Sequence, residues 1–117
     1  MLKYIDMKHK MKLTPSAFNA IASGRKTVEM RLCDEKRAKV KVGDIIEFEN
    51  TDTREMVKCT VTNLSRFSDF FELYSRYDKT AIGYNENEIA SAKDMYAYYS
   101  PEQIKKYGAL AIQIKLI

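Results

Sequence analysis

The chain has 117 residues, 45% of them hydrophobic and 31% charged, which predicts one small folded domain, and it contains no apolar run long enough for a transmembrane helix. The net charge of +4 is uneven: residues 1–41 carry eleven Lys and Arg against four Asp and Glu, whereas residues 42–117 carry nine against twelve. The basic first third indicates either a polyanionic partner or a solvated basic face. The single His and the two distant Cys argue against a zinc site and against a His-based catalytic triad, and no cofactor is expected.

The first segment, residues 4–13, mixes polar and apolar side chains and is predicted to be an edge strand. Charged residues interrupt each of its apolar stretches, so no signal peptide is expected and the chain is placed in the cytoplasm. In that reducing compartment, Cys33 and Cys59 are expected to be free thiols.

A helix is predicted to follow Thr14, which can cap it, with Pro15 at the first helical position. One apolar face recurs at three- and four-residue spacing and consists of Phe18, Ile21 and Ala22. Gly24 suits the left-handed residue that ends many helices.

Three strands are predicted next, over residues 27–32, 45–49 and 56–64. The first alternates strictly, which places Val28, Met30 and Leu32 on one face and Thr27, Glu29 and Arg31 on the other. A turn at Gly43-Asp44 precedes the second strand, and a polar turn at 51–54 precedes the third.

The second half is predicted to contain three helices and a final strand. The first helix opens at Ser68 and has an aromatic stripe for core packing, formed by Phe70, Phe71, Tyr74 and Tyr77. The second spans residues 86–98, with Ile89, Ala92 and Tyr96 aligned. Ser100 and Gln103 form a capping box for the third, which ends near Gly108 before a strand over 109–117.

These elements predict an α+β fold of about five strands and three or four helices. Because the strands alternate, the sheet is expected to be antiparallel or mixed. A small curled sheet or barrel with helices at its rim fits this count, and periodicity does not distinguish the two.

The segment with the clearest functional pattern is Gly24-Arg25-Lys26-Thr27-Val28-Glu29-Met30-Arg31, at the junction between the first helix and the following strand. Glu29 and Arg31 project from the same face of that strand, about 6.5–7 Å apart, and Lys26 stands at its start. These charges form either a functional cleft or an exposed salt-bridge ladder, worth at most about 1 kcal/mol.

The pattern Gly-x-Lys-x-x-Glu-x-Arg, after a short helix and before a Val-Gly-Asp turn, resembles the ASCH domain family. The resemblance runs from Thr14 to Phe48, resumes from Tyr98 through Gly108, and continues into the final strand, so it covers nearly the whole chain as one domain over residues 1–117. It implies a PUA-like fold, a small barrel with flanking helices, and a link to RNA.

The resemblance also implies a cleft that binds RNA or a nucleotide and is lined by Lys26, Glu29 and Arg31. Both cations can hold phosphate, and the carboxylate can accept a hydrogen bond from a base or a ribose. Arg25 lies beside this cleft. Tyr98 and Tyr99 offer either a stacking surface for a base or core packing. The basic loop that contains Arg37, Lys39 and Lys41 either extends the cleft or is solvated.

Whether the chain is an enzyme is left open by these residues. Some ASCH proteins are amidohydrolases of acetylcytidine, and their catalytic lysine corresponds to Lys26 here. They have a threonine three residues later, where this chain has Glu29, so Lys26 and Glu29 are the catalytic candidates if the chain is an enzyme. They also use a later glutamate, for which Glu86 and Glu88 are candidates. A ribonuclease reaction, with Lys26 and Arg31 stabilising phosphate charge, is a further alternative within the family.

Overall fold

A computed structural model describes residues 7–117 as a mixed five-stranded sheet with flanking helices. In chain order the elements are β1 (Lys8–Leu13), α1 (Pro15–Ala22), β2 (Val28–Leu32), the 3-10 turn η1 (Arg37–Lys39), β3 (Ile45–Asn50), β4 (Met56–Phe67), α2 (Phe70–Arg76), the 3-10 helix η2 (Ala92–Ala97), α3 (Pro101–Tyr107) and β5 (Ala109–Leu116). This arrangement confirms the predicted α+β class.

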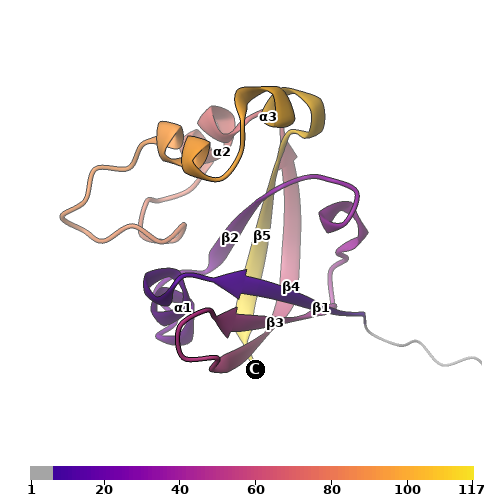
Figure 1. The fold of residues 1–117 in the computed structure, drawn as a ribbon, viewed down its shortest axis with the longest axis vertical. Coiled ribbons are helices and arrows are strands. Elements are labelled where there is room, and N and C mark those ends of the chain that lie inside the picture. Colours follow the sequence, from indigo (N-terminus) through magenta and orange to yellow (C-terminus); the bar gives the residue numbers. More distant parts are fainter. Residues whose placement is uncertain (1–6) are drawn as a thin grey trace, which may run out of the picture.

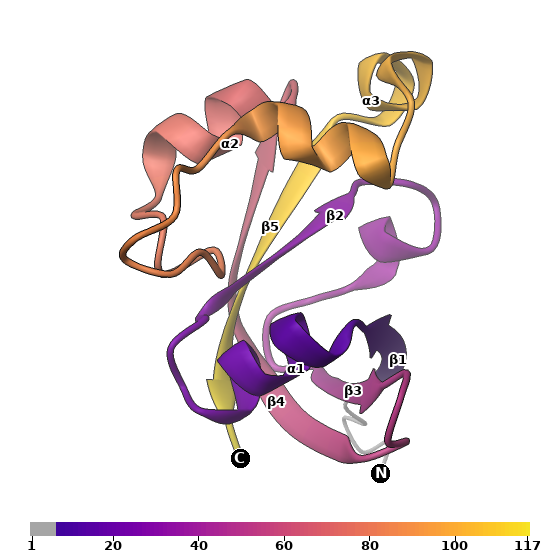
Figure 2. The same ribbon diagram turned by 60° about the vertical axis from the view of Figure 1, so that its left-hand side comes forward.

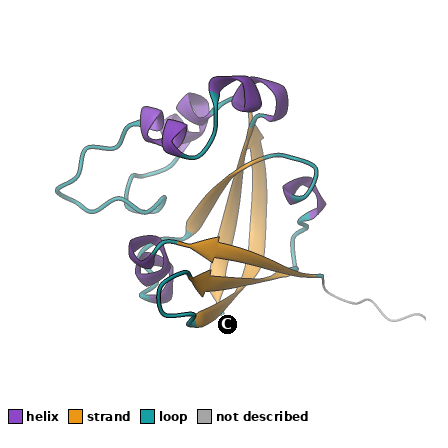
Figure 3. Cartoon of the chain, in the orientation of Figure 1, coloured by secondary structure: helices purple, strands orange, loops and turns teal. Residues whose placement is uncertain are grey.

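The sheet is curled into a half-barrel with strand order β1-β3-β4-β5-β2 (Figure 1, Figure 3). β1 and β3 are parallel, and the other neighbouring pairs are antiparallel. The twelve-residue β4 pairs with both β3 and β5, and its register shifts between Val61 and Asn63. A bulge increases the local bend of a strand, so this irregularity favours the curl of the sheet. β1 (Lys8–Leu13) is an edge strand, as predicted, and residues 4–6 of the predicted strand lie outside the described residues.

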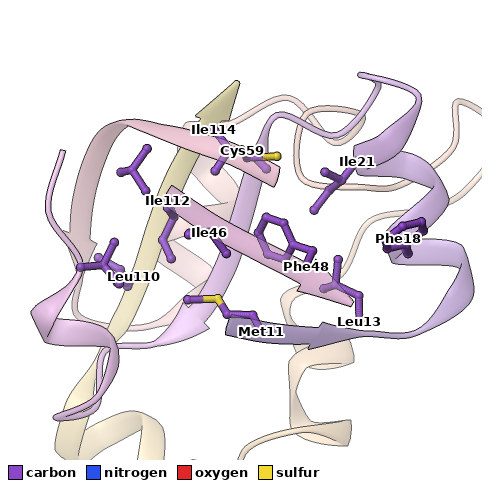
Figure 4. Packing of buried hydrophobic residues seen from close by; sticks show 12 residues of the cluster. Met11, Leu13, Phe18, Ile21, Ile46, Phe48, Cys59, Leu110, Ile112 and Ile114 are labelled. Atoms are coloured by element: carbon purple, nitrogen blue, oxygen red, sulfur yellow. The ribbon is translucent and has the colours of Figure 1, made fainter. Parts of the chain in front are cut away.

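Two hydrophobic cores cover opposite faces of the sheet. The half-barrel encloses the first, which includes Met11, Phe18, Ile46, Phe48, Cys59 and Ile112 (Figure 4). The second lies beneath α2, η2 and α3, which gather at one end of the sheet (Figure 1). β5 serves both: Leu110 and Ile112 enter the first core, while Ala109 and Ala111 face the second. Alternate side chains of this final strand therefore lie in different cores, so both faces of β5 are buried.

The helix ends that the sequence predicted from Pro, Gly and capping residues agree with those in the structure. Pro15 begins α1, although the Thr14 side chain makes no capping hydrogen bond. Ser100 and Gln103 form the reciprocal capping box at the start of α3. Gly24 has a φ of +82° just beyond α1, as expected for a left-handed residue.

The predicted helix over residues 86–98 is wrong. Residues 86–91 belong to a loop, and only Ala92–Ala97 form a helical segment, of the 3-10 type. Ile89, predicted on the apolar face, is 91% exposed. The aromatic stripe of α2 is also partly wrong, because Phe71 points to solvent while Phe70 and Leu73 are buried. The sequence pattern underestimated β4, which continues past residue 64 to Phe67.

Three further features bear on the sequence predictions. Both cysteines are free, and burial raises the pKa of the Cys59 thiol to about 11. His9, near the start of β1, hydrogen-bonds the buried carboxylate of Asp44 at 2.8 Å. No helix of residues 7–117 combines the length and apolar character needed to cross a membrane.

Two glycines give a matched test of the backbone. Gly108 has a φ of +74°, and a Cβ there would lie 2.7 Å from the carbonyl oxygen of Phe67, whereas one on Gly24 would meet nothing within 4 Å. We expect Gly108→Ala to cost at least about 2–3 kcal/mol and Gly24→Ala about 1–2 kcal/mol in urea unfolding. Equal costs would contradict the close packing of Gly108 on the end of β4.

Candidate functional site

A pocket of about 470 Å³ opens beside β2, between the start of α1 and the segment that carries Gly83, Tyr84 and Glu88. Figure 2 shows α1 and this segment on the same side of the molecule, with β2 between them. η2 and the residues that follow it complete the wall with Asp94, Met95, Tyr98 and Tyr99. The volume lies within the range of small-molecule sites.

A buried group of three charged side chains, which we call the charged trio, lies in the wall of the pocket. Glu29 is 3% exposed and receives Lys26 Nζ on Oε1 and Arg31 Nε on Oε2, each at 2.7 Å. Lys26 is only 8% exposed. The predicted gathering of these three residues is therefore present in the structure, and the solvent-exposed ladder considered as an alternative is not.

Local backbone contacts bring the trio together. The Lys26 N–H donates to Ala20 in α1, and the Thr27 and Val28 N–H groups donate to Ala81. Pairing of β2 with β5 directs Val28 and Leu32 into the helix-covered core, so Glu29 and Arg31 face the other side. Gly83 leaves room for Lys26, because a Cβ at Gly83 would lie 3.0 Å from Lys26 Cδ.

The trio carries a net positive charge. Burial favours the neutral form of Glu29, but the charges and hydrogen bonds of Lys26 and Arg31 outweigh it and lower the pKa of its carboxyl. Glu29 is therefore ionised at neutral pH. An ammonium has three N–H donors and a guanidinium has five, so both cations keep donors beyond those that Glu29 accepts.

Arg31 also connects the two edge strands of the half-barrel. Its Nη2 donates to the carbonyl oxygen of Lys12 in β1 at 3.0 Å. Since β1 and β2 stand at opposite ends of the strand order, this contact bridges the open side of the curled sheet. The trio is thus tied to both edges, and the Lys12 side of the pocket is fixed relative to β2.

Beside the trio, the pocket lining also carries carboxylates and hydroxyls. Tyr84 donates its hydroxyl to Asp94 Oδ2 at 2.7 Å and lies 2.9 Å from the Tyr74 hydroxyl. Burial and the hydrogen bond to Asp94 raise the pKa of Tyr84, so it stays a neutral donor. Glu88 adds a second carboxylate to the lining. The pocket lining therefore offers both cations and hydrogen-bond acceptors.

The remaining predicted residues separate into two groups. Arg25 lines the pocket and donates to the Tyr84 carbonyl at 3.0 Å, and Tyr98 lines it while 65% exposed. Tyr99 also borders the pocket, but its ring stacks on Phe70 with a centroid distance of 5.9 Å. The basic loop lies apart: none of its residues lines the pocket, and Arg37 pairs with Asp34 at 2.8 Å.

Sequence reasoning missed several lining residues, namely Lys12, Met30, Tyr74, Tyr84 and Asp94. For Lys12 a signal existed in the alternating lysines of the first strand. The tyrosine–aspartate pair gave none, because residues ten apart meet only through the path of an irregular loop. Within residues 7–117, no three His, Cys, Asp or Glu side chains cluster in a way that could hold a metal ion.

Comparisons with known proteins agree on one family. A sequence model of the ASCH domain matches residues 11–117. The fold is similar to that of hypothetical protein PH0355, with a TM-score of 0.80 and 32% identity over 95% of this chain and 100% of that one. It is also similar to protein PF0455 from Pyrococcus furiosus, with a TM-score of 0.69 and 29% identity over 95% and 98% of the two chains.

An ASCH protein from Zymomonas mobilis shares the fold at 21% identity, with a TM-score of 0.66 over 92% of this chain and 66% of that one. A search of curated proteins found no match.

Proposed function

The chain belongs to the ASCH domain family, and from this premise we propose that its pocket binds a nucleotide, either free or within single-stranded RNA. The family is broadly associated with RNA binding. The observation that carries the proposal is the charged trio, a buried group of net positive charge in the wall of a pocket of about 470 Å³. We further propose that the protein acts in the cytoplasm, in RNA metabolism or its regulation.

The pocket lining offers partners for both the phosphate and the nucleoside of a nucleotide. Lys26 and Arg31 keep free N–H donors for phosphate oxygens, and charge-assisted bonds of this kind are stronger than neutral ones. Glu88 and Asp94 can accept from ribose hydroxyls or exocyclic amines. Because both Glu29 oxygens already receive a cation, we assign Glu29 the role of orienting Lys26 and Arg31.

Fluorescence anisotropy with labelled RNA at several salt concentrations tests this proposal. We expect short single strands to bind, with affinity falling as salt rises, because phosphate contacts release counterions. A blunt duplex is expected to bind more weakly, since its bases are not free to enter a pocket. Flat titrations with single strands and with free nucleotides would contradict the proposal.

The adjacent tyrosines should differ in their effects. We expect Tyr98→Ala to weaken binding of a base by about 1–3 kcal/mol with little loss of stability, because its ring is exposed at the pocket. Tyr99→Ala should mainly lower the free energy of unfolding, since its ring stacks on Phe70. Paired thermal unfolding and titration measure both effects, and a Tyr98 variant that binds normally would remove the stacking role.

Amidohydrolase activity on acetylcytidine or a related nucleoside is the second candidate, favoured by Glu88 in the pocket lining. Glu86 does not line the pocket, so Glu88 is the better match for the later glutamate of that branch. Against this, Lys26 Nζ is bound to Glu29 at 2.7 Å and would have to leave that contact before acting as a base. Acetate release that disappears in Lys26→Ala would support this activity, and no turnover across a panel of acylated nucleosides would exclude it for those substrates.

A further inference from the structure

Three lysines lie along the outer side of the edge strand β1. Lys8, Lys10 and Lys12 are exposed, while the residues between and after them face inward: His9 toward Asp44, and Met11 and Leu13 into the core. Side chains two residues apart on a strand project from one face at intervals of about 6.6–6.8 Å. This regular spacing is close to that of successive phosphates in an extended single strand of RNA. We call these three residues the lysine track.

The track leads directly into the pocket. Lys12 is both its last member and part of the pocket lining, and its carbonyl oxygen accepts Arg31 Nη2 at 3.0 Å. Lysine side chains therefore follow β1 from Lys8 to Lys12, and Arg31 and Lys26 lie beyond Lys12 in the pocket lining. Because the Arg31 contact holds β1 against β2, the direction of the track relative to the pocket is fixed by the fold.

Neighbouring carboxylates leave most of this charge available. In β3, Glu47 and Glu49 lie beside Lys10 and Lys12 in the parallel register. Their side chains are recessed, at 13% and 21% exposed, and Glu47 is shared by Lys8 and Lys58 at 3.9 Å each. Among residues 7–117, neither Lys10 nor Lys12 has a side-chain ion pair within 4.0 Å. An exposed lysine without a partner can neutralise a phosphate at little cost.

We propose that the lysine track binds the phosphodiester backbone of a single-stranded RNA, one nucleotide of which occupies the pocket. The inference rests on the proposed function and extends it from one nucleotide to about four. The lysine track, and not the basic loop, is then the path of the RNA strand. Arg37 of that loop is paired with Asp34, and none of the loop residues lines the pocket. A duplex would not fit this arrangement without unpairing the nucleotide that enters the pocket.

The test compares a mononucleotide with RNA oligomers of two to six nucleotides, titrated against wild type, Lys8→Ala/Lys10→Ala and the control Lys39→Ala/Lys41→Ala. For wild type, we expect affinity to rise with length up to about four nucleotides and then level off. The track variant should lose tenfold or more in oligomer affinity, and its slope of log K against log salt should shrink by about 1.4, or 0.7 for each phosphate contact. Its affinity for the mononucleotide should not change.

The outcomes separate the track from the pocket. If the mononucleotide binds and the oligomers bind wild type and the track variant equally well, the lysine track is not an RNA-binding surface. The proposed function would still stand. Equal losses in the track and control variants would also overturn it, because general surface charge would then explain the binding. If neither mononucleotide nor oligomer binds to wild type, the proposed function fails, and the track fails with it.

Discussion

Replacing Glu29 by glutamine is expected to lower the free energy of unfolding by about 3–5 kcal/mol at neutral pH, the range for breaking a buried ion pair from one side. The variant retains the shape of the side chain and loses its charge. Lys26 and Arg31 would then share a buried site as two like charges, both formerly held at 2.7 Å by one carboxylate. Urea unfolding measures the loss, with the exposed loop residue Glu86→Gln as the matched control.

The pH dependence of this loss has a defined sign. Because the pKa of Glu29 is lowered in the folded protein, its charge contributes stability at pH values above the ordinary glutamate pKa, near 4.5. That contribution is lost as pH falls toward the lower folded pKa, where Glu29 becomes neutral like glutamine. The difference between wild type and Glu29→Gln should therefore be full at pH 7 and shrink in acid. A loss below about 1 kcal/mol at pH 7 would show that the trio is solvated, as a surface ion pair is.

Replacing Lys26 by methionine is expected to weaken nucleotide or RNA binding about 10- to 100-fold. A hydrogen bond to a charged group contributes about 1.5–3 kcal/mol, and each 1.4 kcal/mol is a factor of ten. Methionine keeps most of the side chain that passes Gly83, so packing there changes little. Glu29 retains Arg31 as its partner, and we expect the variant to fold.

A matched lysine separates this effect from net charge. Lys39→Met removes one positive charge from the exposed η1 turn, outside the pocket lining, and should bind like wild type. Circular dichroism of both variants checks that the fold is intact. If Lys26→Met is folded and binds with unchanged affinity, the trio is structural and the ligand contacts lie elsewhere.

Local patterns were sufficient to predict much of the fold. The strict alternation of residues 27–32 placed Glu29 and Arg31 on one face, where the structure has them. Pro15, Gly24 and the Ser100–Gln103 capping box marked helix ends because each satisfies a backbone requirement within a few residues. The ASCH-like motif then pointed to the end of β2 at which the pocket opens.

The features that the sequence did not predict depend on long-range contacts. The loop before η2 is held by contacts such as Arg25 with the Tyr84 carbonyl and Tyr84 with Asp94, and no local pattern encodes them. Helical spacing over residues 86–98 was misleading because tertiary packing buries Ala92 and Met95 and leaves Ile89 in solvent. The parallel pairing of β1 with β3, which directs the lysine track into the pocket, is likewise set by packing across the half-barrel.

The most direct test of the central claim is calorimetric titration of a nucleoside and its monophosphate against wild type and Lys26→Met. If the trio binds phosphate, the monophosphate should bind wild type at least tenfold more tightly than the nucleoside, and most of that difference should disappear in the variant. The nucleoside itself should bind both proteins about equally. An advantage of the monophosphate that persists in Lys26→Met, or no advantage in wild type, would contradict the claim that Lys26 and Arg31 form a phosphate site.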